Sequence, residues 1–443
     1  MTVPDPSTDP VSDPVSGTVP VTPPGAAEAL AVWWRIGLLS FGGPAAQIAL
    51  MHRTLVDERR WLSEREFLDA LGFCMLLPGP EAMQLATWAG HRLHGVRGGL
   101  IAGGLFVLPG AMVILLLAAL YAELGALPWV QALFLGVQAT VVVIVMEALL
   151  RVSRRALTGP RDRAIAAAAF AALFLFDLPF PLVIGVAAAI GVIGSTASAP
   201  GEHRIITSVS LRDTARTAVL WLALWWLPLL GIAALTTEPL WQQLGTFFSL
   251  LATLTFGGAY AVLAWMVQDV VTARGWLTGE QMLAALGLAE TTPGPLILVT
   301  EFVGFLAAHR LGGFWHGVAG AAIALWATFV PCFLWIFTFG PWIDRLSASE
   351  RVRGALSAIT AAVVGVILNL SVWFALHVFF GEVTRDTLGP LVLWTPTLSS
   401  WQPLTLLLAV VAGVLLLRLH WPLLRVLPLM AVAGLVPVLL FGS

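Results

Sequence analysis

The chain has 443 residues, of which 58% are hydrophobic and 11% are charged, and its formal net charge is −2. A soluble protein of this size needs about 25% charged residues to cover its surface, so soluble multidomain folds and basic nucleic-acid-binding surfaces are excluded. The two cysteines lie in separate hydrophobic segments, which indicates neither a disulfide framework nor a metal cluster. The composition predicts an all-α integral membrane protein embedded in a lipid bilayer.

Residues 1–25 are rich in Pro, Ser, Thr and Asp and lack the basic start and apolar core of a secretory signal, which predicts a disordered tail. From residue 27 onward the chain consists of apolar runs separated by short, arginine-bearing connections. About 20 apolar residues span a bilayer as a helix. The predicted hydrophobic segments are 27–50, 66–93, 96–122, 126–150, 164–176, 178–196, 214–236, 243–270, 281–308, 313–341, 353–380, 402–418 and 421–441.

The second half of the chain repeats the first. A shift of 215 residues places Phe41-Gly42-Gly43 on Phe256-Gly257-Gly258 and Pro78-Gly79-Pro80 on Pro293-Gly294-Pro295 without a gap. Of the 41 positions from Ser40 to Pro80, 17 are identical at this shift. Two apolar stretches do not share so many residues by chance, so the hydrophobic unit is duplicated.

The duplication predicts a first transmembrane repeat at 26–196, a cytoplasmic loop with a central linking helix at 197–240, and a second repeat at 241–443. Each repeat holds six hydrophobic segments, and one further segment lies between them. Because this unpaired crossing reverses direction, the second repeat is expected upside down relative to the first. Inverted repeats are typical of secondary transporters, whose substrate sites lie near the bilayer midplane beside discontinuous helices.

Arginines in the short connections predict the orientation. Three arginine-rich connections fall on one side, and the positive-inside rule makes that side, together with the N-terminus, cytoplasmic. The connection 51–65 also carries four arginines and would face outward if the segment before it crossed the membrane. The conflict disappears if 27–58 and 66–93 are re-entrant hairpins, whereas broken spanning helices are the alternative. The three connections are 151–163, 197–216 and 342–353.

Each repeat carries two breaks, here named by their central residues as the Phe-Gly-Gly break and the Pro-Gly-Pro break. Proline disrupts a helix interior and glycine permits a left-handed turn. Such backbone is tolerated in a bilayer only where it packs in protein or lines a cavity. Pro44 and Pro80 are expected to be the first residues of new helices, whose N-termini attract an oxyanion. Kinks for close helix packing are the alternative. The predicted substrate-binding residues are Arg35, Ser40, Gly42, Gly43, Pro44, Pro78, Gly79, Pro80, Thr255, Gly257, Gly258, Thr291, Thr292, Pro293, Gly294 and Pro295.

Polar residues inside the apolar segments are further candidates. Arg35 lies five residues before Ser40, and an intramembrane cation marks a functional site unless its side chain snorkels to the interface. Gln47 and His52 follow the first break at helical spacing and can face the same cavity, although a loop-facing position is favoured for His52. Buried carboxyl groups are expected to be proton carriers or helix caps. These are Glu81, Glu290, Glu301 and Glu147.

The sequence contains no enzyme signature. His91 and His94 are three residues apart, but no further His, Cys or carboxylate cluster completes a metal site. A phosphate-binding loop and a nucleophile with its base are also missing from the sequence. We therefore expect a protein that is not an enzyme and has neither a metal nor a cofactor.

The breaks belong to an ordered set of motifs. In the first half these are Ser40-Phe41-Gly42-Gly43-Pro44, Trp61-Leu62-Ser63-Glu64, Met75-Leu76-Leu77-Pro78-Gly79-Pro80-Glu81 and Phe106-Val107-Leu108-Pro109-Gly110. In the second half they are Thr255-Phe256-Gly257-Gly258, Trp276-Leu277-Thr278, Glu290-Thr291-Thr292-Pro293-Gly294-Pro295 and Phe302-Val303-Gly304-Phe305. As a set they resemble the chromate ion transporter family in its long, two-domain form.

The resemblance implies a multi-pass protein of the bacterial cytoplasmic (inner) membrane that exports chromate and confers chromate resistance. Its energy is expected from the membrane potential or the proton gradient, as in an antiporter. Sulfate, a tetrahedral dianion like chromate, is the expected competitor. In this family the position of Arg35 is commonly basic. Uptake or exchange of sulfate or another anion, an anion channel and a membrane-embedded sensor remain alternatives, and so does the formation of a homodimer.

Overall fold

The computed structural model describes residues 24–194, 210–256, 259–343 and 349–441, so nearly all of the predicted N-terminal tail lies outside the described residues. The first half contains α1 (Ala26–Leu39), α2 (Gly43–His52), η1 (Arg53–Glu58), α3 (Glu64–Cys74), α4 (Glu81–Leu124), α5 (Pro128–Ala156), α6 (Pro160–Phe174) and α7 (Phe180–Ile193), followed by α8 (Leu211–Leu235). The second half contains α9 (Pro239–Thr253), α10 (Ala259–Val267), η2 (Gln268–Ala273), α11 (Gly279–Thr291), η3 (Leu296–Leu298), α12 (Val299–Gly312), α13 (Phe314–Phe339), η4 (Gly340–Trp342), α15 (Glu350–Phe379), α16 (Pro403–Gly413), η6 (Val414–Arg418) and α17 (Leu423–Phe441).

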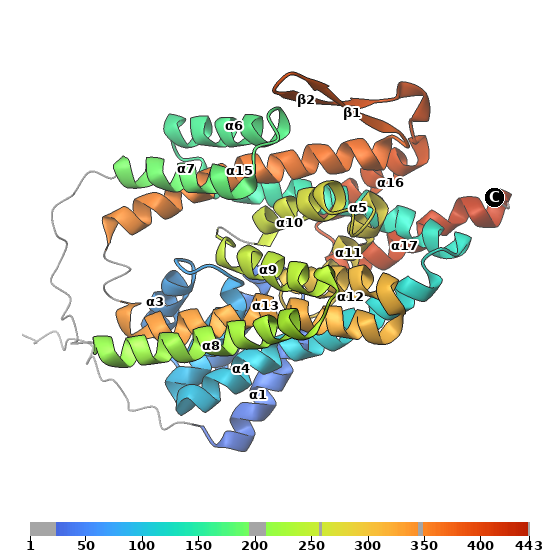
Figure 1. Ribbon diagram of the computed structural model, residues 1–443. Coiled ribbons are helices and arrows are strands. Elements are labelled where there is room, and N and C mark those ends of the chain that lie inside the picture. The colour runs from blue at the N-terminus through green and yellow to red at the C-terminus, as the bar shows by residue number, and fades with distance from the viewer. Residues whose placement is uncertain (1–23, 195–209, 257–258, 344–348, 442–443) are drawn as a thin grey trace, which may run out of the picture.

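Helices make up almost all of the described chain (Figure 1). Within the described residues, five helices are apolar and long enough to cross a membrane by length and composition, namely α4, α5, α8, α13 with η4, and α15. The predicted all-α class is therefore confirmed. One hairpin of β1 (Val383–Leu388) and β2 (Leu391–Pro396) lies between α15 and α16, where the sequence predicts only a connection.

The two halves build the same elements in the same order. In each half two short helices flank the Phe-Gly-Gly break, a π-helical turn follows, and a third helix leads to the Pro-Gly-Pro break. The third helix starts with the same capping box, made by Ser63 and Glu66 in α3 and by Thr278 and Gln281 in α11. These reciprocal caps satisfy backbone donors at the helix start. The local structure therefore follows the sequence repeat.

Helix α4 is two helices joined at a sharp break. His94 and Gly95 have non-helical backbone, with φ of −135° and +61°, and they divide α4 into α4a (81–93) and α4b (96–124). This agrees with the predicted division between segments 66–93 and 96–122. A Cβ on Gly90 would overlap the backbone of Gly98, so α4a folds back against α4b at close range. In the second half, α12 and α13 meet in the same way through Gly304 and Gly320.

The segments around the breaks fold back as helical hairpins. At the open end of the first, Glu28 in the first turn of α1 lies 2.6 Å from Arg59, directly after η1. At the open end of the second, Glu66 near the start of α3 lies 3.2 Å from Arg92 near the end of α4a. Each pair of helices thus returns to the end where it began. Each segment therefore forms a helical hairpin at its break, and its re-entrant position in the membrane stays a prediction.

The hairpins of the two repeats open toward opposite ends of α4b. Before α4b, the His94 ring nitrogen Nε2 lies 2.8 Å from the carbonyl oxygen of Pro24, which precedes α1. At its far end, Glu123 lies 3.2 Å from His309 near the end of α12. At 1.5 Å per residue α4b is about 43 Å long. The open ends of the two sets of hairpins are therefore separated along the length of this helix.

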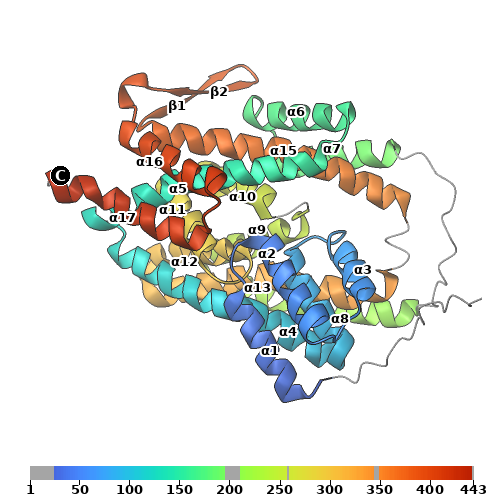
Figure 2. The same ribbon diagram turned by 180° about the vertical axis from the view of Figure 1, so that it is seen from behind.

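The repeats also exchange their last helices. Helices α6 and α7 of the first repeat pack on α15 of the second, while α16 and α17 of the second pack on α5 of the first. Glycines allow the close approach: a Cβ on Gly365 in α15 would overlap the Ala166 backbone in α6, and one on Gly136 in α5 would overlap the Met430 backbone in α17. Figures 1 and 2 show α8 along the outside of α13 and α9. The exchange leaves the breaks in the interior between the repeats.

Candidate functional site

The breaks of the two repeats are hydrogen-bonded to each other in two reciprocal pairs. The Gly294 N–H donates to the carbonyl oxygen of Ser40 at 2.8 Å, and the Gly79 N–H donates to that of Thr255 at 2.9 Å. Both bonds join a Pro-Gly-Pro break of one repeat to the Phe-Gly-Gly break of the other. Gly79 and Gly294 have φ of +123° and +91°, a region that L-residues with a side chain avoid. Glycine is therefore required at both positions.

The first pair is closed by Gln47. Its Nε2 donates to the carbonyl oxygen of Gly294 at 2.7 Å and to that of Ser40 at 3.2 Å, so one amide joins both repeats. Its Oε1 is buried and has no hydrogen-bond partner among the residues that the structure describes. The Ser40 hydroxyl donates back to the Ile36 carbonyl at 2.6 Å, and Gly42 takes a left-handed φ of +84° before α2 begins. Ser40 therefore contributes its carbonyl, and not its hydroxyl, to the contact between repeats.

The second pair has the same plan with different side chains. The Thr255 hydroxyl donates to the Leu251 carbonyl at 2.6 Å, as Ser40 does in the first repeat. Gln84 Nε2 donates to the Pro78 carbonyl at 2.6 Å and holds that break. A Cβ on Gly79 would lie 2.8 Å from Gln84 Nε2 and 3.1 Å from Cys332 Sγ. The predicted binding residues Gly257 and Gly258 lie outside the described residues.

The two prolines that follow the breaks differ slightly from their predicted positions. Pro44 is the second residue of α2, which begins at Gly43, and Pro80 is the cap residue that precedes α4. Each proline still lies at a helix start, where a missing backbone N–H costs nothing. Helix N-termini at these breaks thus agree with the sequence prediction, with a shift of one residue at each proline.

Thr291 and Thr292 use their hydroxyl groups within their own helix. Thr291 donates to the Leu288 carbonyl at 2.7 Å and Thr292 to the Ala289 carbonyl at 3.0 Å. These bonds satisfy carbonyls at the C-terminal end of α11, which have no partner within the helix. The two hydroxyl groups can therefore donate to a ligand, as predicted, only if their hydrogen bonds to these carbonyls break.

Helix α4b supports the second Pro-Gly-Pro break. A Cβ on Gly110 would overlap the Pro293 carbonyl oxygen and would lie 2.6 Å from Leu298 Cδ1. The break therefore packs directly on the backbone of α4b. Gly110 belongs to the Phe106–Gly110 motif, whose sequence shows a proline and a glycine but does not reveal which segment they contact.

The predicted carboxyl groups fall into different environments. Glu290 is buried beside the second break and accepts a hydrogen bond of 2.7 Å from the Tyr260 hydroxyl. Glu301 in the first turn of α12 is 1% exposed, and within the described part of the chain its Oε2 has no hydrogen-bond partner. Glu81 is the first residue of α4. Glu147 is half-buried on α5 and pairs with Arg151.

The sequence model of the chromate transporter family matches residues 27–192 and 242–436 of the chain, which is most of its length. The chain belongs to the chromate transporter family. It is 29% identical over 393 residues to a probable chromate transport protein of Synechococcus elongatus, covering 86% of this chain and 93% of the relative. It is 33% identical over 345 residues to a chromate transport protein of Pseudomonas aeruginosa, covering 77% and 79%. No solved structure matches it.

Arg35 is a predicted substrate-binding residue of this chromate transporter. The structure does not bring it to the breaks. Its side chain is exposed on α1, on a face where Trp34, Leu38 and Leu39 are 42%, 42% and 51% exposed. Ser40, by contrast, is fully buried. The geometry of the paired breaks therefore involves backbone groups and two glutamines, and Arg35 lies on the outer face.

The sequence gives little or no indication that the side chains of Gln47, Gln84 and Tyr260 lie at the paired breaks. Gln47 lies in the interior, whereas His52 is at the open end of its hairpin, 2.6 Å from Glu64. Gln84 and Tyr260 have no prediction attached to them. The signal that finds Gln47 and Tyr260 is a polar residue next to a break where the other repeat has an apolar one: a shift of 215 pairs Gln47 with valine and Tyr260 with alanine.

Proposed function

We propose that this chromate transporter exports chromate across the bacterial cytoplasmic membrane by secondary active transport, and that the dianion binds where the breaks pair. The reciprocal hydrogen bonds from Gly294 to Ser40 and from Gly79 to Thr255 carry the proposal. They support one central site built from both repeats, as in other inverted-repeat transporters. The names of the relatives from S. elongatus and P. aeruginosa support chromate as the substrate.

Backbone donors are the proposed ligands of the dianion. Helices α2 and α4 begin at the first-repeat breaks, and η3 and α12 begin after the second Pro-Gly-Pro break. Their first N–H groups have no partner within the helix and carry partial positive charge. Several such termini aimed at one place stabilise a tetrahedral dianion without a permanent cation. Gln47 and Gln84 hold the breaks in this geometry through their amide groups.

Proton coupling is proposed for the buried carboxyl groups, with Glu290 as the first candidate. Glu290 lies directly before the threonines that lead into the second Pro-Gly-Pro break, and Tyr260 of the second Phe-Gly-Gly hairpin donates to it. A proton gained or lost at Glu290 therefore acts on two hairpins at once. Glu301, with an unpartnered buried oxygen, is the second candidate, and Glu81 the third.

The proposed orientation places the N-terminus and the arginine-rich connections in the cytoplasm. The Trp342 indole N–H in η4 donates to the Thr214 hydroxyl in α8 at 3.1 Å, which brings the ends of the connections 197–216 and 342–353 together. A shared location supports the positive-inside assignment. Under this assignment the first-repeat hairpins open to the cytoplasm and the second-repeat hairpins open outward.

Chromate flux in everted membrane vesicles tests this function. We expect saturable accumulation of radiolabelled chromate that requires a proton gradient or membrane potential and falls when sulfate is added in excess. Vesicles without the protein are the control. Accumulation of sulfate with no chromate flux would indicate sulfate exchange instead, and a non-saturable leak that ignores the gradient would indicate a channel. Either result would refute the proposal.

A further inference from the structure

A basic cleft lies at the C-terminal end of α5, away from the paired breaks. It has a volume of about 450 Å³ and is lined by Glu147, Arg151, Arg154, Arg155 and His420, with two leucines of η6. The sequence uses these arginines only to predict orientation. Their grouping around one cavity is a property of the fold, because the exchange of helices brings η6 onto α5.

The cleft carries an excess of positive charge. Arg151, Arg154 and Arg155 are spaced three and four residues apart, which places them on one face of α5. Arg151 pairs with Glu147, whereas within the described residues Arg154 and Arg155 have no ion pair. Arg154 and Arg155 thus lie in the last turn of α5 with no carboxylate counter-charge paired to them among the described residues. An anion in the cleft would supply that counter-charge, and guanidinium groups match the geometry of oxyanions.

The cleft is electrostatically linked to the breaks. Arg155 lies close enough to Glu81 for their charges to interact, and Arg151 and Glu147 do the same with Glu290. Glu81 directly follows one Pro-Gly-Pro break and Glu290 lies just before the other. The charges of the basic cleft thus act on one carboxyl group beside each Pro-Gly-Pro break.

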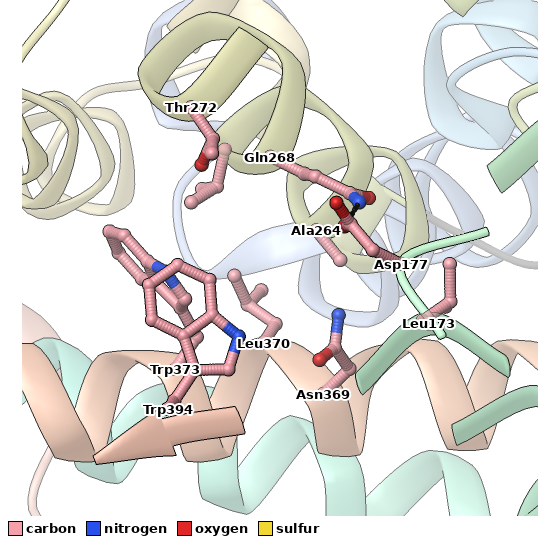
Figure 3. A pocket seen from close by; sticks show the side chains of 10 residues that line it. Leu173, Asp177, Ala264, Gln268, Thr272, Asn369, Leu370, Trp373 and Trp394 are labelled. Carbon is pink, nitrogen blue, oxygen red and sulfur yellow. Dashed lines mark hydrogen bonds between the residues drawn. The ribbon is translucent and has the colours of Figure 1, made fainter. Parts of the chain in front are cut away.

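The position in the other repeat that corresponds to this cleft lies beside Asp177 and is not basic. The fold therefore does not require the positive charge of the cleft. Asp177 and His420 both take left-handed backbone, with φ of +49° and +52°, and occupy equivalent places after α6 and η6. The cavity beside Asp177 has a volume of only about 30 Å³ and no arginine in its lining. Figure 3 shows Trp373 and Trp394 on one side of it and Asp177 with Gln268 on the other.

The β hairpin covers this second cavity. Arg385 of β1 pairs with Asp177, and the Val392 N–H of β2 donates to the Leu175 carbonyl at 2.7 Å. Gln268 donates a further hydrogen bond to Asp177. At the equivalent point of the first repeat, the described residues 157–159 join α5 directly to α6 without a hairpin. One of the two related positions is therefore small and covered, and the other is large and basic.

We propose that the cleft of Arg151, Arg154, Arg155 and His420 is a binding site for a tetrahedral dianion such as sulfate or chromate, which captures the anion before it reaches the paired breaks. The capture step rests on the proposed function, whereas binding in the cleft does not. The phosphate of an anionic lipid has the same chemistry as a free oxyanion. The test therefore has to separate the two sources.

Protection of a cysteine in the cleft measures binding directly. Leu417→Cys is purified in detergent without added lipid, where the native Cys74 and Cys332 are buried, and its maleimide labelling rate is measured with sulfate or with chloride at equal ionic strength. We expect sulfate, but not chloride, to slow labelling by about fivefold or more, because only a dianion engages several guanidinium groups. In the Leu417→Cys protein, the further substitutions Arg154→Gln and Arg155→Gln should remove the protection by sulfate. The control substitution Arg163→Gln, on α6 outside the cleft, should preserve it.

The inference fails if sulfate gives no protection, or if protection survives in the Arg154→Gln, Arg155→Gln variant. It also fails if protection appears only when phosphatidylglycerol is added, since the cleft would then be a lipid site. In vesicles, the same double variant should raise the KM for chromate by about tenfold at low salt and leave the maximal rate close to wild type, because a capturing charge acts mainly on association. Sulfate protection in a protein that moves no chromate would refute the proposed function alone.

Discussion

Replacing Gly110 with alanine should reduce chromate transport to background. A Cβ at this position overlaps the Pro293 carbonyl oxygen, and backbone cannot rotate aside as a flexible side chain does. The second Pro-Gly-Pro break has to move away from α4b, which disturbs the bond from Gly294 to Ser40. Overpacking of this kind costs about 1–3 kcal/mol. Flux of radiolabelled chromate in everted vesicles measures the effect.

Gly104→Ala on the same helix is the matched control. A Cβ at Gly104 has no atom within 4 Å, so this variant should transport chromate like the wild type. Size-exclusion profiles of both variants in detergent separate a loss of transport from a loss of folding. Wild-type flux in a folded Gly110→Ala protein would show that the contact between α4b and the break is not needed for transport.

Glu290→Gln should abolish chromate accumulation driven by a proton gradient and preserve exchange of chromate across the membrane. The glutamine side chain keeps the shape of the glutamate and can still accept the Tyr260 hydrogen bond, but it cannot bind and release a proton. Because Glu290 lies beside the second break, the substitution should uncouple transport without removing the anion site. The two readouts are gradient-driven uptake and counterflow into vesicles preloaded with unlabelled chromate.

Glu280→Gln provides the comparison for this variant. Glu280 is exposed in the first turn of the same helix, α11, and its replacement should leave both readouts unchanged. If Glu290→Gln retained full gradient-driven accumulation, the proton role would pass to Glu301 or Glu81. Loss of both uptake and counterflow would instead make Glu290 part of the anion site.

The breaks and the repeats could be predicted from the sequence because their causes are local. Proline and glycine disrupt a helix wherever it lies, so the breaks and the separation of α4a from α4b at His94 and Gly95 follow from residue types. The hairpins were one of two alternatives. The contacts that close them, such as Glu28 with Arg59, join residues about 30 positions apart that a hydrophobicity pattern does not relate.

The pairing between repeats could not be predicted, because it depends on packing between distant segments. In a segment that is apolar on all sides, no periodicity indicates which face is buried. The sequence therefore does not place Arg35 on the outer face of α1, and it makes Gln47 only one of several candidates for the interior. The β hairpin was also missed: its first strand is mainly exposed and polar, and its second strand follows a short Gly-Pro turn.

Labelling of one equivalent residue in each repeat tests most directly whether two opposed repeats meet at their breaks. Glu58 and Ala273 are related by the shift of 215 residues, and both are exposed at the end of a π-helical turn. With an impermeant maleimide, Glu58→Cys should be labelled from the cytoplasmic side only and Ala273→Cys from the external side only. Labelling of both cysteines from the same side would contradict the opposed repeats, and with them the shared central site for the dianion.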